Sequence, residues 1–175
     1  MRSNVLKFFI LAVVSVTLVS CAYRINYTLS GASIPPEAKT FSVAYFPNNA
    51  TMVAPTLSSE MTNSLKNIFM TRTRLTEVTE GGDFAFEGEI TNYTSTTASV
   101  SSSTTNDYGS LNRLTITVKV RFTNVIDEKS SFNKSFSAFT DYDSTILLTS
   151  IESELIATIL EEIIDDIFQE AASNW

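Results

Sequence analysis

The residues best suited to chemistry in this sequence are four acidic side chains near its C-terminus. They are Glu161, Glu162, Asp165 and Asp166. Their spacing of four brings pairs of them onto one face of a helix, where carboxylates are able to bind a metal ion or exchange protons. An amphipathic helix with one apolar and one solvated acidic face has the same pattern. We adopt this second interpretation, and we therefore predict no metal site and no cofactor.

Two other residue types needed for common catalytic sites are missing or rare. The sequence has no histidine, and its one cysteine is Cys21. A serine–histidine–aspartate triad or a cysteine–histidine pair therefore cannot form, and the usual ligands of zinc are lacking. Catalysis would have to proceed without its commonest proton carrier. We expect a protein that is not an enzyme and that has no catalytic residues.

The first twenty residues have the layout of a secretory signal. Arg2 and Lys7 are their only charged residues, and residues 8–19 are apolar apart from one serine and one threonine. This apolar run is about 12 residues long, whereas a helix that spans a bilayer needs roughly 20. A basic start followed by a short apolar run is typical of a signal that directs export and is then removed.

A four-residue motif closes this signal: Leu18, Val19, Ser20 and Cys21. It resembles the bacterial lipobox, in which signal peptidase II cuts before a cysteine that carries diacylglycerol. The resemblance implies that residues 1–20 are removed and that palmitate-type lipid on Cys21 anchors the protein to a membrane. Ordinary secretion with an incidental cysteine is the alternative. Because residues 22–26 contain no acidic side chain, we expect the periplasmic side of the outer membrane.

The composition of the mature chain limits its partners and its size. Without residues 1–20 it has 155 residues, of which 10 are basic and 19 acidic, a net charge of −9. This charge argues against nucleic acid, whose binding depends on basic residues that neutralise phosphates. The length suits one domain with a hydrophobic core. We predict an extended tether over residues 21–38, stiffened by Pro35 and Pro36, and a single domain over residues 39–175.

Hydrophobic periodicity predicts a strand and then a helix in the first half of this domain. Residues 40–46 alternate between large and small side chains before Pro47, which is typical of a strand. Residues 57–69 have one apolar stripe and one polar face, which predicts a helix. The stripe contains Leu57, Met61, Leu65, Ile68 and Phe69, and the predicted outward face contains Ser58, Ser59, Thr62, Asn63, Lys66 and Asn67. We expect residues 71–78 to continue out of this helix toward Gly81 and Gly82.

Three further strands are predicted from a change to two-residue periodicity. They cover residues 83–95, residues 114–124 and, less regularly, residues 131–139. Residues 99–110 are almost all polar, which predicts a hairpin loop long enough to be either functional or disordered. The polar sides of the first two strands include Glu87, Glu89, Lys119 and Arg121.

The last predicted element is a long C-terminal helix. Thr149 and Glu152 have the spacing of a capping box, which marks a helix start. An apolar stripe then continues for more than four turns. It contains Ile151, Leu155, Ile156, Ile159, Leu160, Ile163, Ile164, Ile167 and Phe168. The opposite face is acidic to its end, although negative charge at a helix C-terminus opposes the helix dipole.

This order of elements predicts an α+β fold. Two amphipathic helices would cover one face of a four-stranded mixed sheet, forming a two-layer sandwich in the order β-α-β-β-β-α. The first two strands, joined by a helix, should be parallel with a right-handed crossover, and the last three should form an antiparallel meander. The polar sides of the strands would then face water or a partner.

Several segments, taken in order, resemble the LptE-type lipopolysaccharide-assembly lipoproteins. They follow the lipobox cysteine in the order of that family and extend over nearly the whole chain. The fold of that family, two helices on a four-stranded sheet, agrees with the pattern above. The segments are residues 31–40, the strand ending in Pro47 and Asn48, Arg72-Thr73-Arg74-Leu75, residues 82–90, and residues 168–175, which end in Asn174 and Trp175.

The resemblance implies a role in assembly rather than catalysis. LptE-type proteins occupy the lumen of the LptD β-barrel in the outer membrane, plug it, assist its assembly, and are thought to contact lipopolysaccharide in transit. Phosphates of the lipid would favour arginine and lysine. The candidates here are Arg72, Arg74, Arg113, Lys119 and Arg121. For each of them a solubilising surface charge is the favoured interpretation, and a net charge of −9 favours the plug role over binding of a polyanion.

Two other functional classes stay open from the sequence. The protein could be a free periplasm-facing lipoprotein that binds a small apolar ligand between sheet and helices. It could instead be a scaffold subunit of another envelope assembly complex, such as one that inserts barrels.

Overall fold

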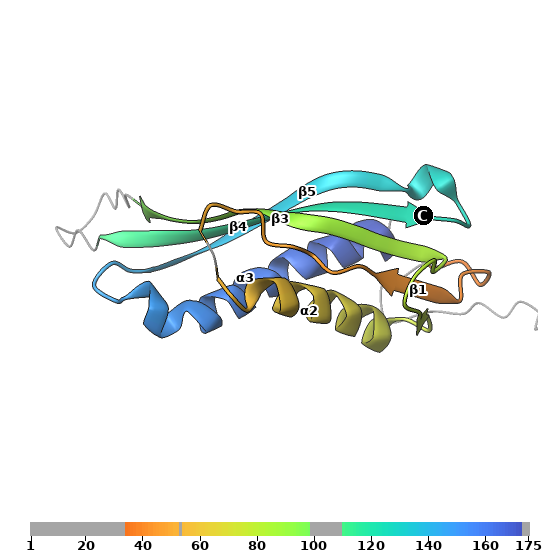
Figure 1. The fold of residues 1–175 in the computed structure, drawn as a ribbon, viewed down its shortest axis with the longest axis horizontal. Helices are drawn as coiled ribbons and strands as arrows, with labels where there is room; N and C mark the ends of the chain where they lie inside the picture. Colours follow the sequence, from red (N-terminus) through yellow and green to blue (C-terminus); the bar gives the residue numbers. More distant parts are fainter. Residues whose placement is uncertain (1–33, 53, 99–109, 173–175) are drawn as a thin grey trace, which may run out of the picture.

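The computed structural model describes residues 34–52, 54–98 and 110–172 as two layers, with two helices packed on one face of a curved sheet (Figure 1). The predicted signal, Cys21, most of the predicted tether, nearly all of the predicted hairpin loop and Trp175 lie outside these residues. The elements are β1 (Thr40–Val43), α2 (Leu57–Arg72), β2 (Thr76–Glu77), β3 (Phe84–Ala98), β4 (Leu111–Asn124), the short 3₁₀ helix η2 (Glu128–Ser130), β5 (Phe132–Asp143) and α3 (Leu148–Ala172).

The sheet has five strands in the order β2-β1-β3-β4-β5. β1 is parallel to both of its neighbours, whereas β3, β4 and β5 form an antiparallel meander. The predicted α+β class and two-layer arrangement are therefore confirmed. The pairing of β3 with β4 extends to Ala98 opposite Leu111 and so includes polar residues. β3 therefore ends later, and β4 begins earlier, than predicted.

The predicted strand count of four was wrong because the chain after α2 does not continue as a helix. Thr73 has extended backbone angles, and its hydroxyl donates to the Phe69 carbonyl at 2.6 Å, which ends the helix. The chain then runs beside β1, where the Thr76 N–H donates to the Lys39 carbonyl at 2.8 Å. The resulting strand, β2, contains two residues, too few to give a periodic signal.

Phenylalanine rings from both layers form the centre of the core. The Phe69 ring on α2 lies 5.7 Å from Phe41 in β1, 4.7 Å from Phe86 in β3 and 5.3 Å from Phe168 on α3, measured between centroids. Phe86 in turn stacks on Phe122 of β4 at 4.8 Å. One side chain thus joins both helices to the sheet.

Two polar residues of α2 do not face outward as predicted. Ser58 and Thr62 are buried beside the apolar stripe. The Thr62 hydroxyl donates to the Ser58 carbonyl at 2.7 Å and accepts the Phe46 N–H at 3.1 Å. These bonds satisfy polar groups that would otherwise be costly to bury, and they hold the chain after β1 against the helix.

The predicted capping box of the last helix does not form. α3 begins at Leu148, so Thr149 lies within its first turn. Glu152 instead accepts a hydrogen bond from the Tyr93 hydroxyl at 2.5 Å. A register shift between Ile90 and Asn92 turns Tyr93 into the core, where its side chain is 1% exposed. Within the described chain, neither helix combines the length and apolar character that crossing a bilayer requires.

Candidate functional site: the uncovered face of the sheet

The face of the sheet opposite the helices is polar and accessible. We call it the outer face; in Figure 1 both helices lie on the other side of the strands. Side chains alternate between the two sides of a strand, so every second residue of β3, β4 and β5 reaches this face. Its members include Glu87, Glu89, Arg113, Thr115, Thr117, Lys119, Arg121, Asn133, Ser137, Phe139 and Asp141.

Three of the five cations proposed from the sequence share this face. Arg113, Lys119 and Arg121 are alternate positions of β4. Arg72 and Arg74 lie instead at and just after the end of α2. The Arg72 Nη1 atom is 2.9 Å from Asp165 Oδ1, and the Arg74 Nη2 atom donates to the Ile34 carbonyl at 3.0 Å. The structure therefore does not form one cluster from all five.

Arg113 is held by two neighbours on β5. Its Nε and Nη2 atoms donate to the two oxygens of Asp141 at 2.7 and 2.9 Å, and its guanidinium carbon lies 3.7 Å from the centroid of the Phe139 ring. The hydrogen bond from Arg113 lowers the pKa of the Asp141 carboxyl below its usual range. This cation is thus already paired with an anion and stacked on a ring.

Lys119 and Arg121 are arranged differently. They line a hollow of about 280 Å³ on the outer face with Glu87, Glu89 and Asn133. Glu87 is opposite Arg121 in the register and Glu89 is opposite Lys119. Within the described residues neither cation has an anion within 4.0 Å.

The floor of this hollow leaves no room for a side chain at Gly88. A side chain at Gly88 would overlap the Lys119 carbonyl oxygen and approach the Phe46 ring carbon Cε1 to 2.6 Å. On the rim, Glu89 accepts a hydrogen bond from the Asn49 side-chain amide at 2.7 Å. This bond engages the carboxylate of Glu89, the cross-strand neighbour of Lys119.

Sequence reasoning missed Phe139 and Asp141 as parts of this face. The alternation of β5 is weak in the sequence, and the predicted strand stopped at Phe139, before the aspartate. The register pairs Arg113 with Asp141, which shows the relation that the sequence hides. The available signal was that Asp141 lies two positions after Phe139, the last residue of the predicted strand, which is the spacing of one strand face.

The acidic face of α3 is partly neutralised by other elements. Asp165 pairs with Arg72, and Glu170 pairs with Lys134 of β5. These contacts offset the unfavourable charge at the helix C-terminus. Across the described ranges, acidic side chains do not gather in any group of three or more that could hold a metal ion.

Solved structures with the same architecture include bacterial lipoproteins. A minor lipoprotein from Acinetobacter baumannii is 14% identical, with a TM-score of 0.52 over 78% of this chain and 94% of that chain. An uncharacterised lipoprotein B from Nitrosomonas europaea is 11% identical, with a TM-score of 0.52 over 87% of this chain and 91% of that chain. A putative neuraminyllactose-binding hemagglutinin homologue from Helicobacter pylori is 10% identical, with a TM-score of 0.54 over 84% and 90%. At these identities the likeness supports the fold alone.

No curated protein matches this sequence. The profile of the LptE family, described as lipopolysaccharide-assembly, matches residues 38–171, which include every strand and nearly all of both helices. The protein therefore belongs to the LptE family of lipopolysaccharide-assembly proteins.

Proposed function

We propose that this protein is an outer-membrane lipoprotein that plugs an LptD-type β-barrel and assists its assembly during lipopolysaccharide export. Two observations support this proposal: membership of the LptE family and the polar outer face of the sheet. The lumen of a large outer-membrane barrel is wet and lined by polar side chains. A compact domain with a wet sheet face suits such a lumen, and its role there would be structural rather than catalytic.

The lipid would position the domain at the membrane. Cleavage before Cys21 and acylation of its thiol and amino terminus would leave the domain tethered to the periplasmic leaflet by several acyl chains, which anchor far more firmly than one. The described chain starts at Ile34, which Arg74 binds through its carbonyl oxygen. The tether would therefore enter the domain beside the end of α2.

The interior of the domain favours this function over the binding of a small apolar ligand. The space between sheet and helices is filled by the ring contacts around Phe69, with centroids 4.7 to 5.7 Å apart. A ligand there would have to displace well-packed aromatic side chains, which is costly.

Co-purification tests the plug role. The full-length lipoprotein would be extracted with detergent from the outer membranes of its own host and isolated through a C-terminal tag. We expect a barrel of LptD size in a one-to-one ratio that survives gel filtration. A lipoprotein that elutes alone, with no barrel at any detergent concentration tested, would contradict the proposal.

Lys119 and Arg121 are the cations that we propose for contact with lipopolysaccharide phosphates. They share a hollow and have no anion within 4.0 Å among the described residues, whereas Arg72, Arg74 and Arg113 are already engaged. Replacing both by alanine should weaken binding of purified lipopolysaccharide by roughly thirtyfold, since two charge-assisted contacts at about 1 kcal/mol each sum to about 2 kcal/mol. Fluorescence titration at two salt concentrations would measure this effect.

The matched control for this double variant is Lys129→Ala. Lys129 is an exposed residue of η2 that does not line the hollow. Its replacement should therefore leave binding unchanged. Equal affinities for the double variant, the control and the wild type would show that this hollow does not bind the lipid.

A further inference from the structure

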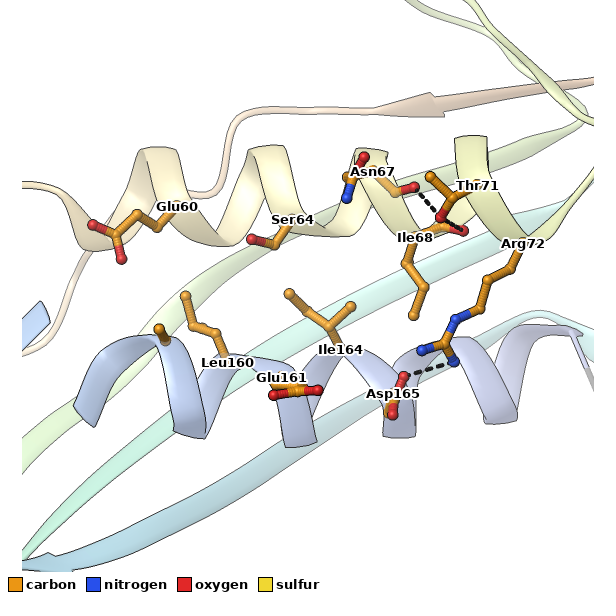
Figure 2. Close-up of a pocket in the computed structure, with 11 residues that line it drawn as sticks. Glu60, Ser64, Asn67, Ile68, Thr71, Arg72, Leu160, Glu161, Ile164 and Asp165 are labelled. Carbon is orange, nitrogen blue, oxygen red and sulfur yellow. Dashed lines mark hydrogen bonds and ion pairs between the residues drawn. The ribbon is translucent and has the colours of Figure 1, made fainter. Parts of the chain in front are cut away.

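The helix layer carries a groove that the proposed function does not use. It runs between α2 and α3 and encloses about 440 Å³ (Figure 2). Ile68, Leu160 and Ile164 form an apolar floor, and Figure 2 shows these side chains pointing into the space between the two helices. Arg72 reaches across to Asp165 near one end of the groove, and Glu60 lies toward the other end.

The charges along this groove are unbalanced. Glu60 and Glu161 line it, and within the described chain neither carboxylate has an ion-pair or hydrogen-bond partner. The two helices carry only two cations, Lys66 and Arg72. Lys66 lies 2.8 Å from Glu77, and Arg72 lies 2.9 Å from Asp165. The groove therefore presents negative charge that the domain itself does not neutralise.

An apolar floor beneath an acidic rim matches one kind of side chain. Lysine and arginine have a long apolar stem and a charged head, and they bury the stem while the head stays at a polar edge. A stem laid along Ile68 and Leu160 would bring its head to Glu161. Ala157 leaves room for it, because this exposed residue of the groove has only a methyl group.

We propose that this groove is the docking site for a lysine- or arginine-bearing segment of the barrel partner. The inference rests on the proposed plug function and names the surface through which the plug would be held. Two copies of this chain would bring the same acidic rims together, which opposes self-association. The outer face of the sheet would then stay free for the lipid.

Charge reversal tests the proposal in the full-length lipidated protein, isolated with its barrel as above. Glu60→Lys combined with Glu161→Lys should lower the recovered barrel by about tenfold, since like charges would then oppose each other in the contact. The matched control is Glu154→Lys combined with Glu162→Lys. These residues are exposed on α3 and do not line the groove, so this control should recover the barrel as the wild type does.

A second pair of variants tests the shape of the groove without changing charge. Ala157→Phe would fill it and should also reduce recovery of the barrel. Thr158→Phe adds the same ring at the neighbouring exposed position, which does not line the groove, and should leave recovery unchanged. Circular dichroism melting curves would show that each variant is folded.

The outcomes separate this inference from the proposed function. Absence of the barrel from the wild-type preparation would overturn both. Full recovery with the groove variants, or equal loss with groove and control variants, would overturn the groove as the docking site while the plug function stands. Loss confined to the two groove variants would support it.

Discussion

At the scale of single residues, Tyr93 links the sheet to the start of α3. Its side chain is 1% exposed, and its hydroxyl donates to Glu152 at 2.5 Å. Tyr93→Phe should lower the free energy of unfolding by about 1.5–3 kcal/mol at neutral pH, the usual contribution of a hydrogen bond to a charged acceptor. The same substitution at Tyr45, which is 63% exposed, should have little effect. Urea denaturation followed by circular dichroism would measure both.

The pH dependence of this effect has a defined sign. Burial, together with the nearby Glu152 carboxylate, raises the pKa of Tyr93 far above its ordinary value of 10.0. The stabilisation is then fully present below about pH 10 and decreases as the pH rises toward the native pKa, because only the unfolded state releases the proton. The difference in stability between wild type and Tyr93→Phe should therefore shrink above about pH 10. A constant difference up to pH 11 would contradict this assignment.

At the scale of elements, Asp83 fastens β1 to the start of β3. Its Oδ2 atom accepts the Lys39 N–H at 2.8 Å and both the N–H and the hydroxyl of Thr40 at 2.9 Å. These bonds, the backbone bond from Lys39 first, lower the pKa of the carboxyl. Asp83→Ala should therefore lower the melting temperature at pH 7, whereas Asp166→Ala, at an exposed position of α3, should not.

Acid should remove the advantage that Asp83 gives. A carboxyl with a depressed native pKa stabilises the fold above its ordinary pKa of about 4, and this stabilisation is lost as the pH falls through the native value. Melting temperatures of wild type and Asp83→Ala should therefore converge below about pH 4. Curves that stay equally separated from pH 7 to pH 3 would show that the charge is unimportant.

Phe69 connects three elements and should be the most sensitive core position of α2. Phe69→Ala removes the ring that contacts β1, β3 and α3, and it should cost about 3–5 kcal/mol of unfolding free energy. The next residue, Met70, is 49% exposed, and Met70→Ala should change stability by no more than about 0.5 kcal/mol. Denaturant titration compares the two, and a similar loss at both positions would contradict the described packing.

The sequence predicts long elements well and short or irregular ones poorly. Both helices and the meander follow from periodic apolar residues, since burial of one face requires that spacing. β2 was missed because two residues carry no period, and the inward turn of Tyr93 was missed because a register shift interrupts the alternation. The capping box was wrong because Glu152 binds Tyr93, a residue 59 positions away. Contacts of this kind are set by the tertiary fold.

At the scale of the whole molecule, the two layers present different surfaces. The outer face of the sheet carries Lys119 and Arg121, which have no anion within 4.0 Å among the described residues, whereas the helix layer carries the acidic groove lined by Glu60 and Glu161. The sequence places Lys119, Arg121 and Glu161 on polar faces, but not Glu60. It cannot show which of them are neutralised, because the partners of Arg72 and Arg113 are distant in the chain, at Asp165 and Asp141.

We propose above all that this protein acts in moving lipopolysaccharide to the outer leaflet of the outer membrane. Depletion of the protein in its host, followed by pulse labelling of lipopolysaccharide and separation of the two membranes, tests it most directly. We predict that newly made lipopolysaccharide accumulates at the inner membrane and stays inaccessible to surface-specific modification, and that the wild-type protein restores its export. Normal arrival of lipopolysaccharide at the cell surface after complete depletion would contradict the claim.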